Sequence, residues 1–372
     1  MSPIRLFSRL DLRMILVILM LMSLSLLVIS SVTREEMGQQ FFTNYVKSQI
    51  KWFVLGWGVF FLFASMDYHK FQEWTWVFYL IVVLLLLGLF FTTPILNVRR
   101  WYRLPFIGLT LQPSEFAKLS IVLMLGWLLD KEHWEKGRLL LFLLLFTGIP
   151  FLLILRQPDL GSALVLYPIF LVMIYFGRIP KRYFQITAFF GMAAAFFVAM
   201  IFSGFLSHES MKPFFSKVLK EYQYERFNPN TYHQKASQAA IALGGISGAG
   251  WRKSEFSSQK WLPAAHTDSV FAAYGEEFGF LGMLILFILF YLLIFFSFRV
   301  SAVAKDTYGR LLSSGLGAYL SMHILMNILM MCGFLPISGV PLILLTYGGN
   351  SILTTMAALG MLQSIYVRRF MF

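Results

Sequence analysis

The stretch VFAAYGEEFGFLGMLILFILFYLLIFFS, from Val270 to Ser297, is too apolar for the surface of a water-soluble protein. It is longer than the ~20 residues that a helix needs to cross a hydrocarbon core of ~30 Å. Backbone N–H and C=O groups find no water in lipid, so runs of this length and uniformity indicate helices. The stretch therefore predicts a transmembrane helix whose first turns carry two adjacent acids, Glu276 and Glu277.

The rest of the chain has the same character. Of its 372 residues, 58% are hydrophobic and only 13% are charged, whereas soluble domains carry about 25% charged residues. We expect an all-α polytopic membrane protein with about ten transmembrane helices in a single integral domain, residues 1–372. The first run lacks a small-residue cleavage site, so no cleaved signal peptide is expected. The predicted helices are 14–32, 50–66, 75–93, 116–129, 139–155, 160–176, 185–205, 270–297, 311–333 and 342–365.

The distribution of Lys and Arg predicts the orientation. These residues are more frequent in the short loops on the side of the N-terminus, which predicts that both termini are cytoplasmic. The long loop 206–269 then faces outward. Within it, apolar side chains between Phe214 and Tyr222 share one helical face. This predicts an amphipathic helix near 212–222, which lies either in the outer membrane interface or against the protein's own loops.

Overall charge and the absence of familiar motifs limit the function classes. The net charge of +13 suits a protein beside anionic lipid or one that handles a phosphorylated substrate. The single cysteine, Cys332, excludes a disulfide framework and a cysteine-based metal site. The sequence contains no nucleotide-binding loop, zinc motif or Ser-His-Asp order, and we expect no nucleic-acid partner.

Several ionisable residues lie inside or beside the apolar runs. In Q-P-S-E-F-A-K, Glu115 and Lys118 share one face of a helix. Charged groups within a span usually face a cavity and pair with each other. Two interpretations are open: a functional cavity, or a structural ion pair in a helix capped by Ser114. In R-Q-P-D-L-G-S-A, Asp159 is explained by the start of the sixth predicted helix.

The segment V-R-R-W-Y-R places Arg99, Arg100 and Trp101 on the predicted outer side. Planar guanidinium groups suit phosphate oxygens, whereas an interfacial belt of arginine and tryptophan is the alternative. Farther along, Gly and Pro break the ninth and tenth helices at 333–341 and 346–351. Irregular backbone at membrane depth occurs where it is buried in protein or lines a cavity, so we expect these segments to shape a cavity.

Directly before Val270, the segment L-P-A-A-H-T-D-S contains His266 and Asp268. Asp268 is either a helix cap or a reactive carboxylate. His266 is either part of the same site or a hydrogen-bonding loop residue. Glu276 and Glu277 lie roughly 12–14 Å deeper along a straight helix. At that depth they are too far from Asp268 to share its role, and we interpret them as buried structural or cavity-lining acids.

Together these segments resemble the shape, elongation, division and sporulation (SEDS) family, the RodA/FtsW proteins. The resemblance covers essentially the whole chain. It implies a peptidoglycan glycosyltransferase that polymerises lipid II into β-1,4-linked glycan on the outer face of the bacterial cytoplasmic membrane, beside a class B penicillin-binding protein transpeptidase. It is carried by R-R-W, Q-P-S-E-x-x-K, Q-P-D-L-G-S-A, F-N-P, L-P-x-A-H-T-D followed by G-E-E-x-G, and S-G-V-P with a later Y-G-G.

The resemblance also implies roles for individual residues. Asp268 matches the family's essential loop aspartate, and Glu115 and Lys118 match its cavity pair. Arg99, Arg100 and Trp101 match its arginine–tryptophan motif, and Asp159 matches the P-D-L-G turn. We expect Asp268 to act as general base, and Arg99, Arg100 and Lys118, with a divalent cation such as Mg²⁺ as a further candidate, to stabilise the leaving diphosphate. Ala264, Ser269 and Asn350 depart from the family pattern.

The sequence leaves two other functions open: a lipid II flippase, and a non-catalytic scaffold for the transpeptidase. Intramembrane charges and broken helices also suit a transporter. Against a transporter, the candidate groups cluster toward one face of the membrane and the sequence contains no evident internal repeat. The short N-terminus favours elongation and cell shape over division.

Overall fold

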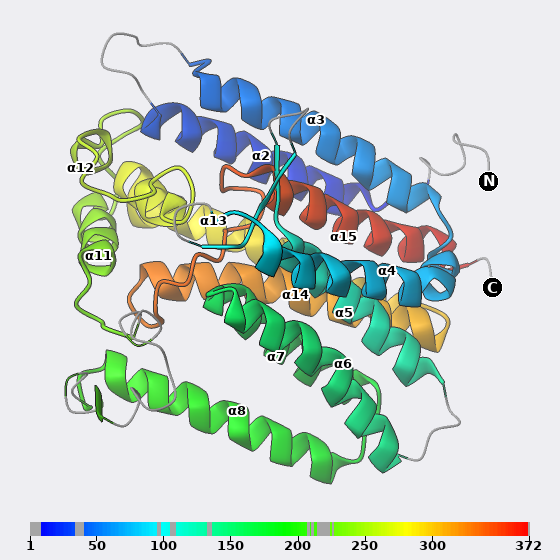
Figure 1. Cartoon of the computed structure of the whole chain (residues 1–372). Coiled ribbons are helices and arrows are strands. Elements are labelled where there is room, and N and C mark those ends of the chain that lie inside the picture. Colours follow the sequence, from blue (N-terminus) through cyan, green and yellow to red (C-terminus); the bar gives the residue numbers. More distant parts are fainter. Residues whose placement is uncertain are drawn as a thin grey trace.

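The computed structural model describes residues 9–33, 41–94, 98–104, 109–131, 136–206, 209, 212–213, 224 and 227–370. These residues form a bundle of long helices with a small β-ribbon and a cap of short helices at one end (Figure 1). Each of the ten predicted runs overlaps one of the long helices. The long helices are α2 (Leu12–Val32), α3 (Asn44–Ser65), α4 (Tyr68–Gly88), α5 (Pro113–Asp130), α6 (Lys136–Arg156), α7 (Leu160–Phe176), α8 (Lys181–Phe202), α13 (Val270–Val303), α14 (Thr307–Met331) and α15 (Gly349–Arg368).

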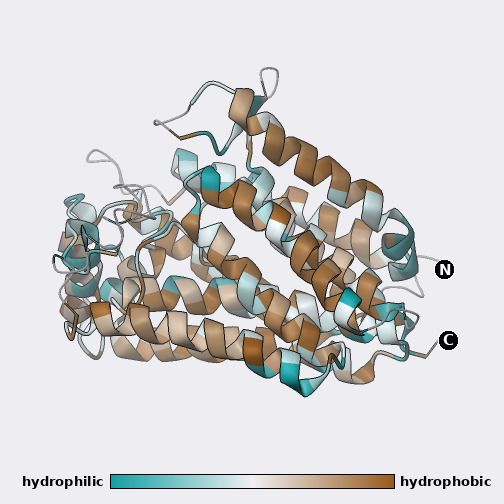
Figure 2. Ribbon diagram, turned by 60° about the horizontal axis from the view of Figure 1, so that its bottom comes forward, coloured by the Kyte–Doolittle hydropathy of each residue, from teal (hydrophilic) through white to brown (hydrophobic). Residues whose placement is uncertain are grey.

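The helices have the composition of a multi-pass membrane protein. Within the described residues, seven are long and apolar enough to cross a membrane: α2, α3, α4, α6, α8, α13 and α14. Helix α7 is apolar but shorter. Figure 2 shows hydrophobic residues along the helix bodies and hydrophilic residues concentrated near their ends. The polytopic class is confirmed, while the number of ten spans remains a prediction.

The two described ends of the chain meet at one end of the bundle. The Asp11 backbone N–H donates to Gln363 Oε1 at 3.0 Å, which joins the start of α2 to α15. At the opposite end lie α11 (Tyr232–Gly244) and α12 (Glu255–Ser258), both within the long loop (Figure 1). The sequence did not predict these two helices. The predicted amphipathic helix near 212–222 lies almost wholly outside the described residues.

A two-stranded antiparallel ribbon precedes α5 and corrects the all-α prediction. Strand β1 (Tyr102–Leu104) pairs with β2 (Leu109–Leu111). The Asn350 side chain donates to the Thr110 carbonyl at 2.7 Å and so attaches the ribbon to the start of α15. The strands were missed because three-residue strands carry too little alternation to recognise.

Helix α13 contains a kink at Gly279, whose φ of 62° and ψ of −164° are not helical. A break of this kind leaves backbone groups without intrahelical partners. Residues 245–250 of the long loop supply the partners on both sides of the kink. The bonds are Ala249 N to Glu276 O at 3.0 Å, Gly250 N to Glu277 O at 2.9 Å, Phe280 N to Gly245 O at 2.9 Å and Leu281 N to Ile246 O at 3.1 Å.

The chain between α14 and α15 is irregular although it is buried. Leu342 to Leu345 are almost fully buried, but α15 begins only at Gly349, so the predicted start of this helix at 342 was wrong. Side chains of α14 satisfy the irregular backbone: the Asn327 amide donates to the Val340 carbonyl at 2.8 Å. Residues of this segment, among them Gly339, Pro341 and Tyr347, line a cavity, as the sequence predicted.

Candidate active site

A cavity of about 590 Å³ opens at the end of the bundle that carries α11 and α12. Its wall combines the starts of α3, α5 and α15, the chain before α13 and the irregular segment after α14. Asp268, Glu115, Arg100 and Trp101 lie together on this wall. Four residues from three separate sequence motifs are thus brought to one site.

Asp268 lies on the cavity wall and is not the cap of α13. The N-cap position is occupied by Ser269, and no side chain makes a capping bond there. The Asn327 amide donates to the Asp268 backbone carbonyl at 3.0 Å and fixes the chain at this point. A Cβ atom placed on Gly339 lies 3.7 Å from Asp268 Oδ2, so the glycine turn passes close to the carboxylate.

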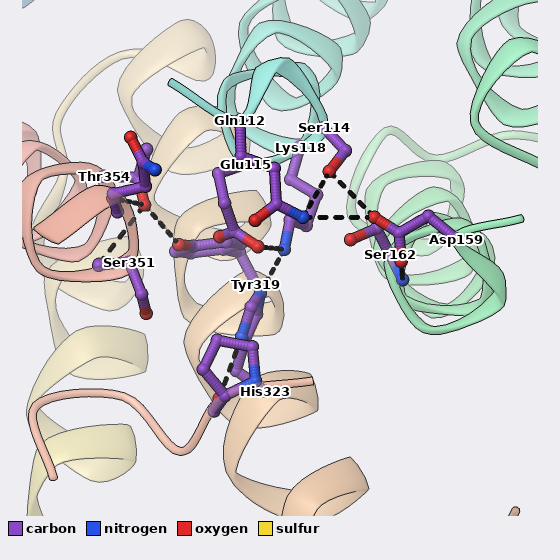
Figure 3. A network of polar contacts seen from close by, with 12 residues as sticks. Gln112, Ser114, Glu115, Lys118, Asp159, Ser162, Tyr319, His323, Ser351 and Thr354 are labelled. Atoms are coloured by element: carbon purple, nitrogen blue, oxygen red, sulfur yellow. Dashed lines mark hydrogen bonds and ion pairs between the residues drawn. The ribbon is translucent and has the colours of Figure 1, made fainter. Parts of the chain in front are cut away.

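Glu115 and Lys118 form an ion pair, with Lys118 Nζ donating to Glu115 Oε1 at 2.7 Å (Figure 3). Lys118 Nζ also lies 2.8 Å from His323 Nε2. The Nδ1 atom of His323 lies 3.3 Å from the Pro341 carbonyl. One tautomer satisfies both contacts, with Nδ1–H donating and Nε2 accepting from the ammonium. His323 could not be predicted from the sequence, because its partners come from other parts of the chain.

The two members of this pair differ in their access to the cavity. Glu115 lines the wall, whereas the Lys118 side chain is fully buried behind it. Lys118 is therefore not one of the residues that line the cavity, and its direct contact with a diphosphate stays a prediction. It holds Glu115 in place. The ion pair is confirmed and its acid faces a cavity, while the function of that cavity stays a prediction.

Asp159 links the turn before α7 to the start of α5 (Figure 3). It caps α7 by accepting from the Ser162 N–H at 3.3 Å. It also accepts from Ser114 Oγ at 3.0 Å and from Gln112 Nε2 at 3.2 Å. The predicted capping of α5 by Ser114 was wrong: the N-cap is Gln112, and the Ser114 hydroxyl is used by Asp159. Asp159 is buried and structural rather than a wall residue.

In the arginine–tryptophan segment, Arg99 differs from the two residues that follow it. This residue is exposed, donates to the Phe90 carbonyl at 2.7 Å and is not part of the wall. Arg100 is on the wall, and its Nε and Nη2 donate to the carbonyls of Gln157, at 3.2 Å, and Pro158. Trp101 donates from Nε1 to Gln112 Oε1 at 3.2 Å. Only Arg100 and Trp101 of this segment reach the cavity.

Glu276 and Glu277 are buried anchors for the long loop and do not line the cavity. Glu276 accepts from the N–H of Phe256 at 2.8 Å, and from the N–H and Oγ of Ser257 at 3.0 and 2.5 Å. Glu277 accepts from Ser254 Oγ at 3.2 Å and from Ser31 Oγ. The kink at Gly279 follows both acids, so the separation from Asp268 that a straight helix predicts still applies to them.

His266 and His233 flank the aspartate in different ways. His266 lies between the rings of Tyr45 and Tyr347, at centroid distances of 4.9 and 6.0 Å, and is not on the cavity wall. His233 Nε2 lies 2.6 Å from Ser269 Oγ, a contact that the sequence did not predict. Burial lowers the pKa of both histidines, which keeps them neutral near pH 7.

The part of the chain that the structure describes holds no cluster of three or more His, Cys, Asp or Glu residues suited to a metal ion. The cavity does carry two carboxylates, Asp268 and Glu115. Glu115 Oε2 is buried and has no hydrogen-bond partner among the described atoms. A single acceptor oxygen beside a cavity fits an ion that is bound mainly by substrate phosphate and water.

Comparison with known proteins identifies a matching family and similar relatives. The FtsW/RodA/SpoVE family model, described as cell cycle protein, matches residues 9–370. The chain is 30% identical over 374 residues to the peptidoglycan glycosyltransferase MrdB of Escherichia coli (strain K12), covering 97% of this chain and 94% of that protein. It is 29% identical over 435 residues to the peptidoglycan glycosyltransferase RodA of Treponema pallidum (strain Nichols), covering 98% of this chain and 99% of that protein.

Solved structures share the fold. The rod shape determining protein RodA of Thermus thermophilus superposes with a TM-score of 0.69 at 23% identity, over 97% of this chain and 98% of that chain. A chain from a structure titled as the coordination of polymerization and crosslinking by a peptidoglycan synthase complex gives a TM-score of 0.78 at 24% identity, with the same coverage.

The helical bundle and its polar cavity define a multi-pass membrane protein with a buried ion pair beside an accessible aspartate. The chain belongs to the FtsW/RodA/SpoVE family. The resemblance recognised in the sequence is confirmed.

Proposed function

We propose that this protein is a peptidoglycan glycosyltransferase that polymerises lipid II into β-1,4-linked strands. Its relatives carry that enzyme name. The observation that carries the proposal is the cavity in which Asp268, Glu115 and Arg100 share one wall. A carboxylate, a second acid and a guanidinium in one cavity match the needs of glycosyl transfer from a diphosphate-linked donor.

Asp268 is the general base. The acceptor hydroxyl must lose its proton as it attacks the anomeric carbon, and the bond to the diphosphate breaks in the same step. Attack from the opposite face inverts an α-linked donor and gives a β-1,4 bond. Positioned proton transfer of this kind contributes about 10²–10⁴-fold to the rate. The bond from Asn327 to the Asp268 carbonyl holds the base at the cavity.

Arg100 stabilises the leaving diphosphate. Its two bonds to carbonyls hold the guanidinium in position, and they do not use the N–H groups of Nη1. A fixed planar donor is well suited to phosphate oxygens. Glu115, held by Lys118, orients the sugar hydroxyls on the same wall.

A divalent cation such as Mg²⁺ fits beside Glu115, whose Oε2 would hold it together with the substrate. When bound, the ion supplies positive charge next to the diphosphate oxygens.

The proposed orientation of the chain in the membrane follows from its positive charges. Lys and Arg near the ends of the chain favour a cytoplasmic position for both termini. The cavity lies at the other end of the bundle and then faces outward in the bacterial inner membrane. A class B penicillin-binding protein is the proposed partner, supported by the likeness to a chain of a peptidoglycan synthase complex.

The test is polymerisation of purified lipid II by wild type and by Asp268→Asn, each with and without the transpeptidase. We expect the variant to make no glycan strands while it keeps the melting temperature of the wild type. Glu255→Gln is the matched control, because this exposed acid lies in the same loop but not on the cavity wall. Normal strand synthesis by Asp268→Asn contradicts the role given to Asp268.

The same preparations distinguish the two alternative functions. A lipid II flippase moves labelled lipid II across a vesicle membrane without making strands. A scaffold does neither, although it raises the activity of its partner. Strand synthesis by the wild type that depends on Asp268 supports the enzyme over both.

A further inference from the structure

A second cavity, of about 640 Å³, lies at the opposite end of the bundle from the proposed active site. It is bounded by the ends of α5, α7 and α13 and by the starts of α6 and α14. Glu115 lines the first cavity and Leu129 lines the second, on the same helix. The helix between them spans about 21 Å at 1.5 Å per residue. The two cavities are therefore separate sites.

Three cations line this second cavity: Lys131, Arg178 and Arg310. The lining residues that the structure describes include neither Asp nor Glu. Asp130, next to Lys131 in the chain, is not on the wall and accepts from Gln72 Nε2 at 2.8 Å. The cavity therefore presents positive charge that its described wall does not neutralise, and a basic pocket between membrane helices suits an anionic headgroup.

Arg178 occupies a backbone position that favours glycine. It follows the end of α7 with a φ of 54°. The N–H of Ile179 donates to the Ile174 carbonyl at 3.3 Å, which is the 6→1 bond of a Schellman helix end. A side chain in this left-handed conformation costs energy that glycine avoids. Strained residues cluster at functional sites, and here the strained residue is one whose side chain lines the cavity.

The rest of the wall is apolar, with contributions from Leu139, Phe176 and Phe298. An apolar wall beside three cations matches a ligand that carries a phosphate next to hydrocarbon. We propose that this cavity binds the phosphate of an anionic phospholipid from the membrane leaflet on the side of the chain ends. The apolar wall contacts the glycerol and the first part of the acyl chains. A free phosphorylated solute carries the same phosphate but gains nothing from the apolar wall.

The test counts phospholipid that remains bound to the full-length protein. The protein is reconstituted in bilayers of phosphatidylcholine with and without phosphatidylglycerol, extracted into detergent and weighed by native mass spectrometry. We expect the wild type to retain phosphatidylglycerol. Arg178→Gln and Arg310→Gln should each weaken retention about fivefold, which corresponds to the loss of one cation near a membrane phosphate.

Matched controls distinguish lipid binding in the cavity from the general attraction of anionic lipid by exposed cations. Arg182→Gln and Lys305→Gln remove exposed cations at the same end of the bundle that do not line the cavity. We expect both to retain phosphatidylglycerol as the wild type does. Equal losses in these controls and in the cavity variants contradict the proposal. A wild type that retains no phosphatidylglycerol but binds inorganic phosphate contradicts the lipid as ligand, and shows a site for a soluble anion.

Arg178→Gly gives a second readout that a folding defect cannot imitate. Glycine relieves the left-handed strain, so the variant should melt at a higher temperature in phosphatidylcholine. It should nevertheless lose phosphatidylglycerol to the same extent as Arg178→Gln. Unchanged lipid retention in Arg178→Gly overturns the role of this guanidinium. Asp268→Asn should retain the lipid, so the outcome is independent of the proposed enzyme activity.

Discussion

Ser269 Oγ and His233 Nε2 are 2.6 Å apart, and this contact joins α11 to the residue that follows Asp268. Ser269 is fully buried, and its N–H donates to the Ala264 carbonyl at 3.1 Å. The long loop therefore fixes the chain on the N-terminal side of α13, while Asn327 fixes the carbonyl of Asp268 itself. His233 is a positioning residue for the proposed base.

We expect His233→Ala to lower the turnover of lipid II polymerisation by about fivefold, because one hydrogen bond of ~1 kcal/mol is lost. His233→Gln, whose amide can still bond to Ser269, should retain most of the activity. A role confined to folding would lower the melting temperature of both variants without separating their turnover numbers.

The same histidine predicts a dependence of stability on pH. Burial lowers the pKa of His233 below its ordinary value of 6.5. Below about pH 6.5 the unfolded chain then binds more protons than the folded chain, so the free energy of unfolding falls as the pH falls. Above about pH 6.5, the contribution of neutral His233 to the free energy of unfolding is fully present. Melting curves at about pH 7.5 and about pH 5 should show a smaller acid-side loss for His233→Gln than for the wild type, and an equal loss contradicts this assignment.

The buried pair of Glu115 and Lys118 predicts non-additive stability. Lys118→Met leaves the Glu115 carboxylate buried without its cation, and breaking such a pair costs about 3–5 kcal/mol. The double variant Glu115→Gln with Lys118→Met removes both charges and should recover much of this loss. A double-mutant cycle on thermal stability in detergent measures the coupling. If the two single effects simply add, the pair does not act as a unit.

Arg99 and Arg100 are adjacent in the sequence but have different surroundings. Arg100→Gln should lower lipid II polymerisation by about tenfold to a hundredfold, because a fixed guanidinium contributes roughly 1.5–3 kcal/mol to a bound phosphate. Arg99→Gln should leave the rate nearly unchanged, since Arg99 is exposed and not on the wall. Equal losses in the two variants point to a general effect of positive charge.

Gly279 predicts a backbone-specific loss of stability. A Cβ atom at this position lies 2.3 Å from the Gly248 nitrogen, and the local φ and ψ are open almost only to glycine. Gly279→Ala should therefore destabilise the protein by at least ~2 kcal/mol and expose the long loop to proteolysis. Gly58→Ala is the control, because a Cβ there has nothing within 4 Å.

The sequence was sufficient for the membrane class, the approximate positions of the long helices and four residues of the cavity wall, namely Arg100, Trp101, Glu115 and Asp268. Long apolar runs are unambiguous, and charged residues within them mark sites because burial of an unpaired charge is so costly. The pairing of Glu115 with Lys118 followed from their spacing along one helix face.

Other parts depended on contacts between distant segments. His323 and Asn327 reach the site from α14, and His233 reaches it from a helix that the sequence did not reveal. Asp268 was equally compatible with a cap and with a wall position, because N-caps and catalytic acids use the same residue type. The kink of α13 was missed because its hydrogen-bonding partners precede it by about thirty residues.

The closure of the α13 kink by residues 245–250 has a consequence for biosynthesis. A membrane helix normally satisfies its own backbone and can enter the bilayer as an independent unit. The peptide groups on either side of Gly279 instead depend on a loop that emerges earlier from the ribosome. The loop and this helix must therefore fold together, and because the loop is synthesised first, it is available when the helix inserts.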